Sequence, residues 1–150
     1  MQLHDKKAFV YLHDSVLLIG SSSGPGACIQ DDFECPVVKF DYPQVTDLEI
    51  GSSIRSAWNY CRRIDLVSSR EAIEKHLAVM EKKNIKSLYK NTKDASVLLK
   101  NGSMYCHASH QKGLGHFIGI GYKKELPETA TDEEIGAMVR DVLSHCTTKY

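Results

Sequence analysis

The chain has 150 residues, of which 42% are hydrophobic and 25% charged, and its formal net charge at pH 7 is zero. These values are typical of one globular domain that buries a substantial core, so we expect a single domain over residues 1–150. They argue against a globally basic nucleic-acid binder, and no apolar run approaches the roughly 20 residues that a membrane-spanning helix needs.

The N-terminal segment and the cysteines both indicate the cytoplasm. The opening letters MQLHDKKAFVY lack the apolar stretch and the small-residue cleavage site of a signal peptide. The cysteines form an odd, scattered set without a C-x-x-C pair, which fits reduced thiols better than a disulfide framework or a zinc module. They are Cys28, Cys35, Cys61, Cys106 and Cys146.

Charge is distributed unevenly along the chain. Residues 1–50 carry a net charge of −5, residues 51–100 of +6 and residues 101–150 of −1. This pattern fits two oppositely charged faces, and it equally fits opposite charges that pair in the folded protein. Glutamates interrupt the basic middle, as where Glu71 precedes Lys75 by four residues, so we interpret it as an ordinary helix surface rather than a nucleic-acid site.

The start of the chain predicts strands. Residues 7–20 read as two short strands joined by a turn at His13–Asp14. A Gly/Ser/Pro-rich loop follows, and residues 36–41 read as another strand. No internal repeat stands out.

Three capping boxes predict three helices, because each pairs a Ser or Thr with a Glu three residues later. They stand at Thr46–Glu49, Ser68–Glu71 and Thr131–Glu134. Apolar residues at helical spacing follow each box, to about residue 63, to about residue 83 and near the end of the chain. The predicted buried residues are Leu48, Ile50, Ile54, Ala57, Trp58 and Cys61, then Ile73, Leu77 and Met80, then Ile135, Met138, Val139, Val142 and Leu143.

A second hairpin is predicted before the last helix. Asn101 and Gly102 readily take the positive φ angles of a tight turn between two apolar runs, and residues 116–122 read as a further strand. Strands outnumber helices and cluster as hairpins. We therefore expect an α+β fold with a mainly antiparallel sheet and about three helices.

The segment GSSSGPGACIQDDFE, residues 20–34, raises the question of a phosphate-binding loop. Its glycines lack the spacing of a Walker loop, no lysine follows Gly26, and the nearby carboxylates would repel phosphate. We interpret residues 20–26 as a flexible turn between strands.

The acidic end of this segment permits several roles. The carboxylates of Asp31, Asp32 and Glu34 around Phe33 could hold a metal, act as acid and base, present charge to a basic partner, or simply form a solvated turn. Metal binding and catalysis would both need further groups from elsewhere in the chain.

A second cluster contains histidines. Cys106, His107, His110 and His116 lie within eleven residues, but their spacing matches no standard zinc site. His107 and His110 with Lys112 could instead serve as acid and base in RNA cleavage. The plain alternative is a polar loop beside the sheet.

Two stretches carry a family resemblance. KAFVY followed by DSVLLIGSSSGPGACIQDDFECPVVKFD resembles the N-terminal region of the immunity proteins of bacterial contact-dependent growth inhibition (CDI), the CdiI type. The closing TATDEEIGAMVRDVLSHC resembles the C-terminal helix of that group. The resemblance covers roughly the first forty and the last twenty residues.

The resemblance implies an inhibitor, not an enzyme, and no cofactor or metal. Such a protein binds the C-terminal toxin domain of its cognate CdiA one-to-one in the cytoplasm and blocks its active site, and the toxin is often a nuclease. We expect Asp31, Asp32, Phe33 and Glu34 to bind the toxin, with the acids taking the place of phosphate and Phe33 as an anchor. His107, His110 and His116 are a secondary candidate surface. The alternative function is a small hydrolase or nuclease that uses His107 and His110.

Overall fold

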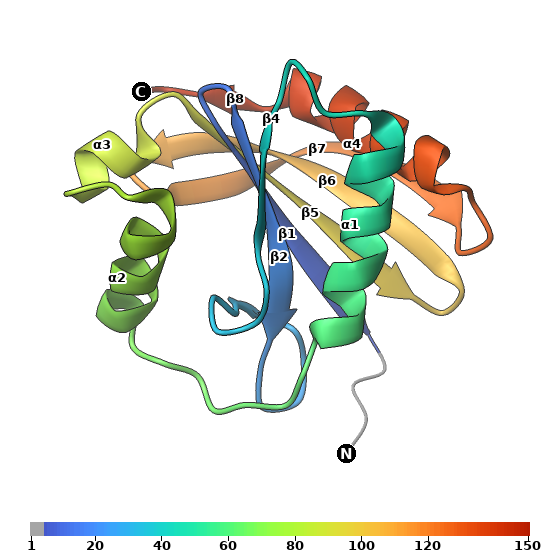
Figure 1. Cartoon of the computed structure of the whole chain (residues 1–150), viewed down its shortest axis with the longest axis horizontal. Coiled ribbons are helices and arrows are strands. Elements are labelled where there is room, and N and C mark those ends of the chain that lie inside the picture. The colour runs from blue at the N-terminus through green and yellow to red at the C-terminus, as the bar shows by residue number, and fades with distance from the viewer. Residues whose placement is uncertain (1–4) are drawn as a thin grey trace.

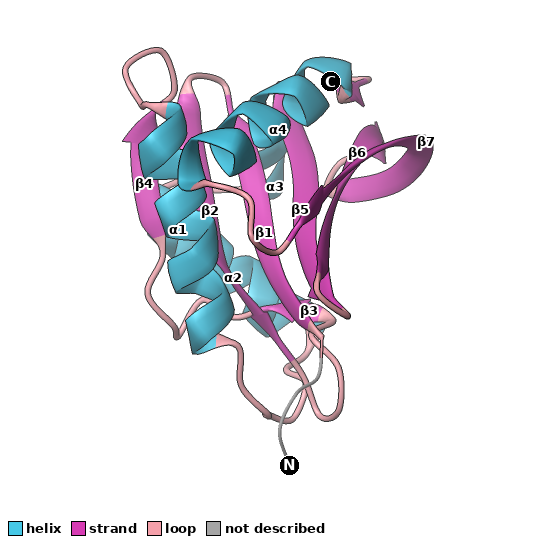
Figure 2. Cartoon of the chain, turned by 90° about the vertical axis from the view of Figure 1, so that its right-hand side faces the viewer, coloured by secondary structure: helices cyan, strands magenta, loops and turns pink. Residues whose placement is uncertain are grey.

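The computed structural model describes residues 5–150 and shows one mainly antiparallel sheet with helices on both faces (Figures 1 and 2). Within these residues the sheet has eight strands and the chain forms four helices. The elements are β1 (Lys6–His13), β2 (Val16–Ser23), β3 (Gln30–Asp31), β4 (Val38–Asp41), α1 (Asp47–Tyr60), α2 (Ser69–Met80), α3 (Ile85–Tyr89), β5 (Thr92–Lys100), β6 (Ser103–Gly113), β7 (His116–Pro127), α4 (Asp132–His145) and β8 (Thr147–Thr148).

The sheet is built mainly from hairpins, in the spatial order β3-β2-β1-β5-β6-β7. β4 pairs with the first half of β2, and β3 with its last two residues. β8 pairs with β6 in parallel. These features confirm the α+β class, and the three predicted helices are present together with the short helix α3, which the sequence did not predict.

Helices cover the two faces unequally. α1 and α4 lie side by side over one face, and α2 and α3 lie on the other (Figure 2). The larger apolar cluster lies under α1 and α4, where Ile50, Ile54 and Ile135 are fully buried. The cluster under α2 and α3 is smaller, and half of its buried members are aromatic. It contains Phe9, Tyr11, Leu18, Met80, Leu88 and Tyr89.

The Gly/Ser segment corrects the expectation of a flexible turn, because Gly20 and Ser21–Ser23 form the buried second half of β2. A Cβ on Gly20 would lie 2.4 Å from the ring of Phe9. The hydroxyl of Ser21 donates a hydrogen bond to the carbonyl of Ala57 in α1 at 2.5 Å. Small side chains are therefore needed where β2 passes between an aromatic ring and a helix.

The helix predictions are confirmed in position and differ in detail. Thr46 and Thr131 form complete capping boxes, and Ser68 accepts a hydrogen bond from the amide of Glu71. α1 and α2 each end three residues earlier than predicted. Leu48, predicted to be buried, is 49% exposed because it lies on the outer side of the first turn.

α1 and α4 begin with the same short motif. Residues 46–55 read TDLEIGSSIR and residues 131–140 read TDEEIGAMVR. The shared residues are the capping Thr, the first Asp, the Glu of the box, an Ile, a Gly and an Arg.

The two motifs pack against each other reciprocally. A Cβ on Gly51 would lie 1.9 Å from the carbonyl oxygen of Asp132, and a Cβ on Gly136 would lie 2.0 Å from that of Asp47. Arg55 binds Asp132 at 2.8 Å, and Arg140 binds Asp47 at 2.6 Å. Each helix thus presses its glycine onto the first turn of the other, and each arginine reaches across to the opposite aspartate.

Replacing Gly51 with alanine is expected to lower the free energy of unfolding by about 2–4 kcal/mol, because the added methyl group meets backbone atoms that cannot move independently. Helix propensity alone predicts the opposite sign, a gain of about 0.5–1 kcal/mol. Urea denaturation of Gly51→Ala and Gly136→Ala measures the change. Ser52→Ala, at an exposed position of the same helix, is the matched control and should be nearly neutral. A stabilised Gly51→Ala variant would contradict the close contact.

Candidate partner-binding face

The predicted acidic residues lie beside a groove formed by three chain segments. Residues 30–34, the extended segment after α1 and the first turns of α2 enclose a volume of about 260 Å³, which we call the acidic groove. Its carboxylates outnumber its cations by five to two. They are Asp31, Asp32, Glu34, Asp65 and Glu71, against Arg62 and Lys75.

Asp32 is an internal ion-pair residue. It is only 3% exposed, and Arg62 binds both of its oxygens, Nε to Oδ2 at 2.8 Å and a terminal nitrogen to Oδ1 at 3.1 Å. Burial alone would raise the pKa of Asp32, but hydrogen bonds from Arg62, Ser23 and Cys35 outweigh it and hold the pKa below its usual range. Asp32 therefore anchors the segment after α1 to the end of β2.

Phe33 and Glu34 point in different directions. Phe33 is half-buried and contacts Phe9 and His76, with ring centroids 5.1 and 4.8 Å apart. Glu34 is exposed, and the hydrogen bond and charge of Lys75, 2.8 Å away, lower its pKa. The ring of Phe33 thus packs against the apolar cluster under α2.

These contacts show how part of the uneven charge pattern is used in the folded chain. Asp32 and Glu34, from the acidic first third, pair with Arg62 and Lys75 from the basic middle. At this groove, opposite charges from distant parts of the sequence meet in the folded chain.

Asp31 faces a second hollow next to the acidic groove. This aromatic cavity, of about 450 Å³, is walled by the rings of Tyr11, Phe33, His76 and Tyr89. The Tyr11 hydroxyl donates to Asp31 Oδ2 at 2.5 Å. Burial raises the pKa of Asp31, and the Tyr11 hydrogen bond and the charge of Lys7 offset this only in part.

An apolar groove continues from the aromatic cavity. It has a volume of about 970 Å³, and Ile73, Ile85 and Leu114 line both hollows. Leu114 comes from the tip of the β6–β7 hairpin, where a Cβ on Gly115 would lie 2.7 Å from the ring of Tyr89. The acidic groove, the aromatic cavity and the apolar groove therefore form one strip along α2, which we call the α2 strip.

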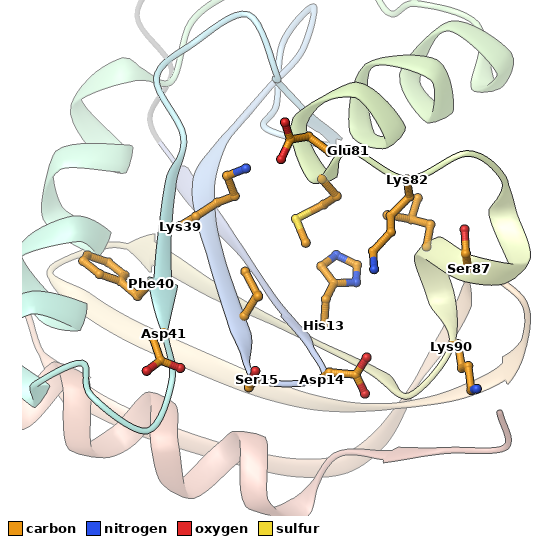
Figure 3. Close-up of a pocket in the computed structure, with 13 residues that line it drawn as sticks. His13, Asp14, Ser15, Lys39, Phe40, Asp41, Glu81, Lys82, Ser87 and Lys90 are labelled. Carbon is orange, nitrogen blue, oxygen red and sulfur yellow. The ribbon is translucent and has the colours of Figure 1, made fainter.

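A further cavity, of about 560 Å³, opens at the C-terminal end of α2, between β4 and α3. Figure 3 shows His13 rising from β1 into it, between the side chains of Lys39 and Lys82. The ring of His13 also reaches His76, with 3.0 Å between the two Nε2 atoms, and its Nδ1 lies 2.9 Å from the hydroxyl of Thr92. Burial lowers the pKa of His13 to about 4 and that of His76 to about 3, so both rings are neutral near pH 7.

The histidines of the second predicted cluster lie on the β6–β7 hairpin rather than in a loop. His107 and His116 are exposed, and the Nδ1 atom of His110 lies 2.8 Å from the hydroxyl of Thr147. Burial and the charges of Lys123 and Lys7 lower the pKa of His107. In residues 5–150 no three His, Cys, Asp or Glu side chains are grouped so that they could share a metal ion.

Sequence patterns did not identify Tyr11, His13 or His76 as residues of this face. The sequence does offer one indication for His76, because it lies three residues after Ile73 on the face of α2 that the spacing predicts to be buried. Tyr11 and His13 alternate with core residues along β1, so their side chains point to the opposite face of the sheet.

A family model described as CdiI, CDI immunity protein, matches residues 6–146. The chain belongs to the CDI immunity protein family. The search of curated proteins finds no match. No helix in the described part of this CdiI chain is long and apolar enough to cross a membrane.

Two solved structures are similar to this CdiI protein. One is a protein of unknown function, NMB0488, from Neisseria meningitidis, with 21% identity, a TM-score of 0.82 and coverage of 97% of this chain and 98% of that chain. The other is in the CdiA-CT/CdiI toxin and immunity complex from Yersinia pseudotuberculosis, with 20% identity, a TM-score of 0.79 and coverage of 95% and 97%. At this level of identity they show the shared fold.

The adjacent carboxylates Asp31 and Asp32 are expected to respond oppositely to removal of charge. Asp32→Asn should lower the free energy of unfolding at pH 7 by about 2 kcal/mol, because the Arg62 hydrogen bonds lose their charged acceptor. Asp31→Asn should not lower it, because the ionised side chain is held away from water without an ion pair. Urea denaturation at pH 7 compares the two, and equal losses would contradict the assignment. The difference should fade below about pH 4, where the unfolded chain takes up protons.

The buried histidines predict a loss of stability in acid. As pH falls from about 6.5 toward 4, the unfolded chain binds protons that His13 and His76 cannot accept in the folded protein, so unfolding is favoured by about 2 kcal/mol per histidine. His76→Gln should therefore show a shallower decline in unfolding free energy between pH 7 and 4.5. His116→Gln, an exposed matched control, should follow the parent protein. A decline in His76→Gln as steep as in the parent would contradict this origin.

Proposed function

We propose that this CdiI protein binds the C-terminal toxin domain of its cognate CdiA in the cytoplasm and neutralises it by covering its active site, in a one-to-one complex. Family membership over residues 6–146 is the observation that carries this proposal. The solved Yersinia structure of the same fold, named as a toxin and immunity complex, supports it. In this proposal the protein acts by stoichiometric binding and needs no catalysis or cofactor.

The α2 strip is the proposed toxin-binding surface. It joins a charged groove, an aromatic cavity and an apolar groove, so one partner segment can meet both polar and apolar contacts. A charge-rich, concave surface also steers an oppositely charged partner toward it. All four predicted residues, Asp31, Asp32, Phe33 and Glu34, line its acidic groove.

The acidic groove favours a nuclease as the toxin. A nuclease binds phosphates with a basic surface, and an inhibitor that covers that surface gains from presenting carboxylates in their place. Glu34, Asp65 and Glu71 offer exposed carboxylates at the groove. Asp32 contributes indirectly, because its bond to Arg62 fixes the shape of the groove.

The β6–β7 hairpin is a proposed secondary contact surface. Its tip residue Leu114 lies in the α2 strip, and His116 follows two residues later at the start of β7. A toxin that fills the strip would therefore lie close to His116 and the exposed strand beyond it. His107 and His110 lie farther back along β6.

The proposal is tested with the C-terminal domain of the cognate CdiA. Co-expression should protect the growth of cells that make the toxin domain, and the purified proteins should form a one-to-one complex in which toxin activity is lost. A chain that binds this domain without protecting cells, or that does not bind it, would overturn the proposal.

Removing three acids should weaken the complex mainly through slower association. The variant Glu34→Gln, Asp65→Asn, Glu71→Gln is expected to bind about tenfold more weakly at low salt and to show a flatter dependence of affinity on ionic strength. The matched control, Asp41→Asn, Glu128→Gln, Glu133→Gln, changes three exposed acids that lie outside both the strip and the β6–β7 hairpin. Surface plasmon resonance across salt concentrations measures both. An unchanged affinity and salt slope would exclude the acidic groove as the contact.

A further inference from the structure

We propose that the aromatic cavity of the α2 strip receives one lysine or arginine side chain of the toxin, whose charged head meets the carboxylate of Asp31. This inference rests on the proposed function, which it extends from a surface to the chemistry of a single anchoring residue.

The cavity wall has the composition of a cation site. His76 lies at its centre, with ring centroids 4.7 Å from Tyr11, 4.8 Å from Phe33 and 5.7 Å from Tyr89. Aromatic faces carry partial negative charge and attract ammonium and guanidinium groups, most strongly where water is excluded. His76 is neutral near pH 7, so it does not repel a cation. The long apolar stem of Lys or Arg would pack along the same rings.

Asp31 supplies the matching charge. Its Oδ2 accepts the Tyr11 hydroxyl at 2.5 Å, which fixes the carboxylate at the cavity wall. Unlike its neighbours Asp32 and Glu34, Asp31 makes no ion pair with any residue of 5–150. A carboxylate removed from water without a cation costs free energy, and a partner's cation would relieve that cost.

A second carboxylate, that of Asp94, lies on this side of the sheet, and burial and the charge of Asp31 raise its pKa well above the usual range. Asp94 on β5 is the direct register partner of Tyr11, so both side chains point to the same face. Asp94 also forms no ion pair among the described residues, and its charge acts on both Tyr11 and Tyr89. Lys7 is the cation whose charge reaches Asp31 and Asp94, and it offsets them only in part.

An apolar anchor fits these observations less well. A leucine or phenylalanine in the cavity would exclude water from Asp31 without giving it a cation, which raises the cost of the buried charge. A cationic side chain can make cation–π contacts with the rings and an ion pair with the carboxylate of Asp31 at the same time.

The decisive variant is Asp31→Asn, which keeps an acceptor for Tyr11 and removes the charge. It should bind the CdiA C-terminal domain at least about 30-fold more weakly, as expected when one partner of a desolvated charge pair is lost. Its unfolding midpoint in urea should equal or exceed that of the parent chain, which separates a lost contact from a damaged fold. Glu133→Gln on α4 is the matched control and should bind like the parent. Full affinity in Asp31→Asn would overturn the inference while leaving the proposed function intact.

A small probe tests the cavity without the toxin. N-acetyl-arginine amide should shift the backbone amide resonances of Gln30, Asp31, Tyr89 and Gly115 in ¹H–¹⁵N spectra, whereas the uncharged N-acetyl-citrulline amide should not. The shifts should be lost in Asp31→Asn. If the toxin domain does not bind the parent chain, the proposed function is wrong. The shifts caused by N-acetyl-arginine amide then show on their own whether the cavity binds a cation. Equal shifts with N-acetyl-norleucine amide would show an apolar site and overturn the inference.

Discussion

The backbone contact between α1 and α4 fixes the geometry on which the binding face depends. Gly51 and Gly136 bring the first turns of the two helices together, and Arg55 and Arg140 hold them there. α1 runs from this contact to Tyr60, where the amide of Cys61 donates to the carbonyl of Trp58, and Arg62 follows that end by two residues. Arg62 then binds Asp32 at the far end of β2. The acidic groove is therefore positioned from the opposite face of the sheet, through the length of α1.

The two faces of the sheet differ in how they are packed and in what they offer a partner. Under α1 and α4 the core is continuous and apolar, as expected for the main source of stability. Under α2 and α3 the cluster is smaller, half of its buried members are aromatic, and polar groups such as the Tyr11 hydroxyl and the paired His13 and His76 interrupt it. Cavities therefore lie beside α2, where a fully packed core would have side chains. A partner can fill these cavities, because apolar and charged groups there still lack contacts.

Local signals in the sequence predicted most helices and strands. Features that depend on contacts between distant parts of the chain could not be predicted in this way. The boxes at Thr46 and Thr131 and the turn at Asn101–Gly102 act within a few residues, so the sequence reveals them directly. The composition of Gly20–Ser23 is typical of a turn, and only the contacts with Phe9 and Ala57 explain why these small residues form a buried strand.

The environments of the acidic residues also could not be predicted from nearby sequence. Asp31 and Asp32 are neighbours with opposite environments, and the partner that separates them, Arg62, lies thirty residues away in the sequence. By contrast, the motif shared by α1 and α4 is visible in the sequence alone, because both capping boxes are followed by Ile-Gly and then by an arginine at the same spacing. The paired motif and α2 lie on opposite faces of the sheet. Side chains on the outer surface of α2 lie across the sheet from Gly51 and Gly136, so they can change without disturbing the helix pair. A chain built in this way can acquire a new binding partner while its folding determinants stay the same.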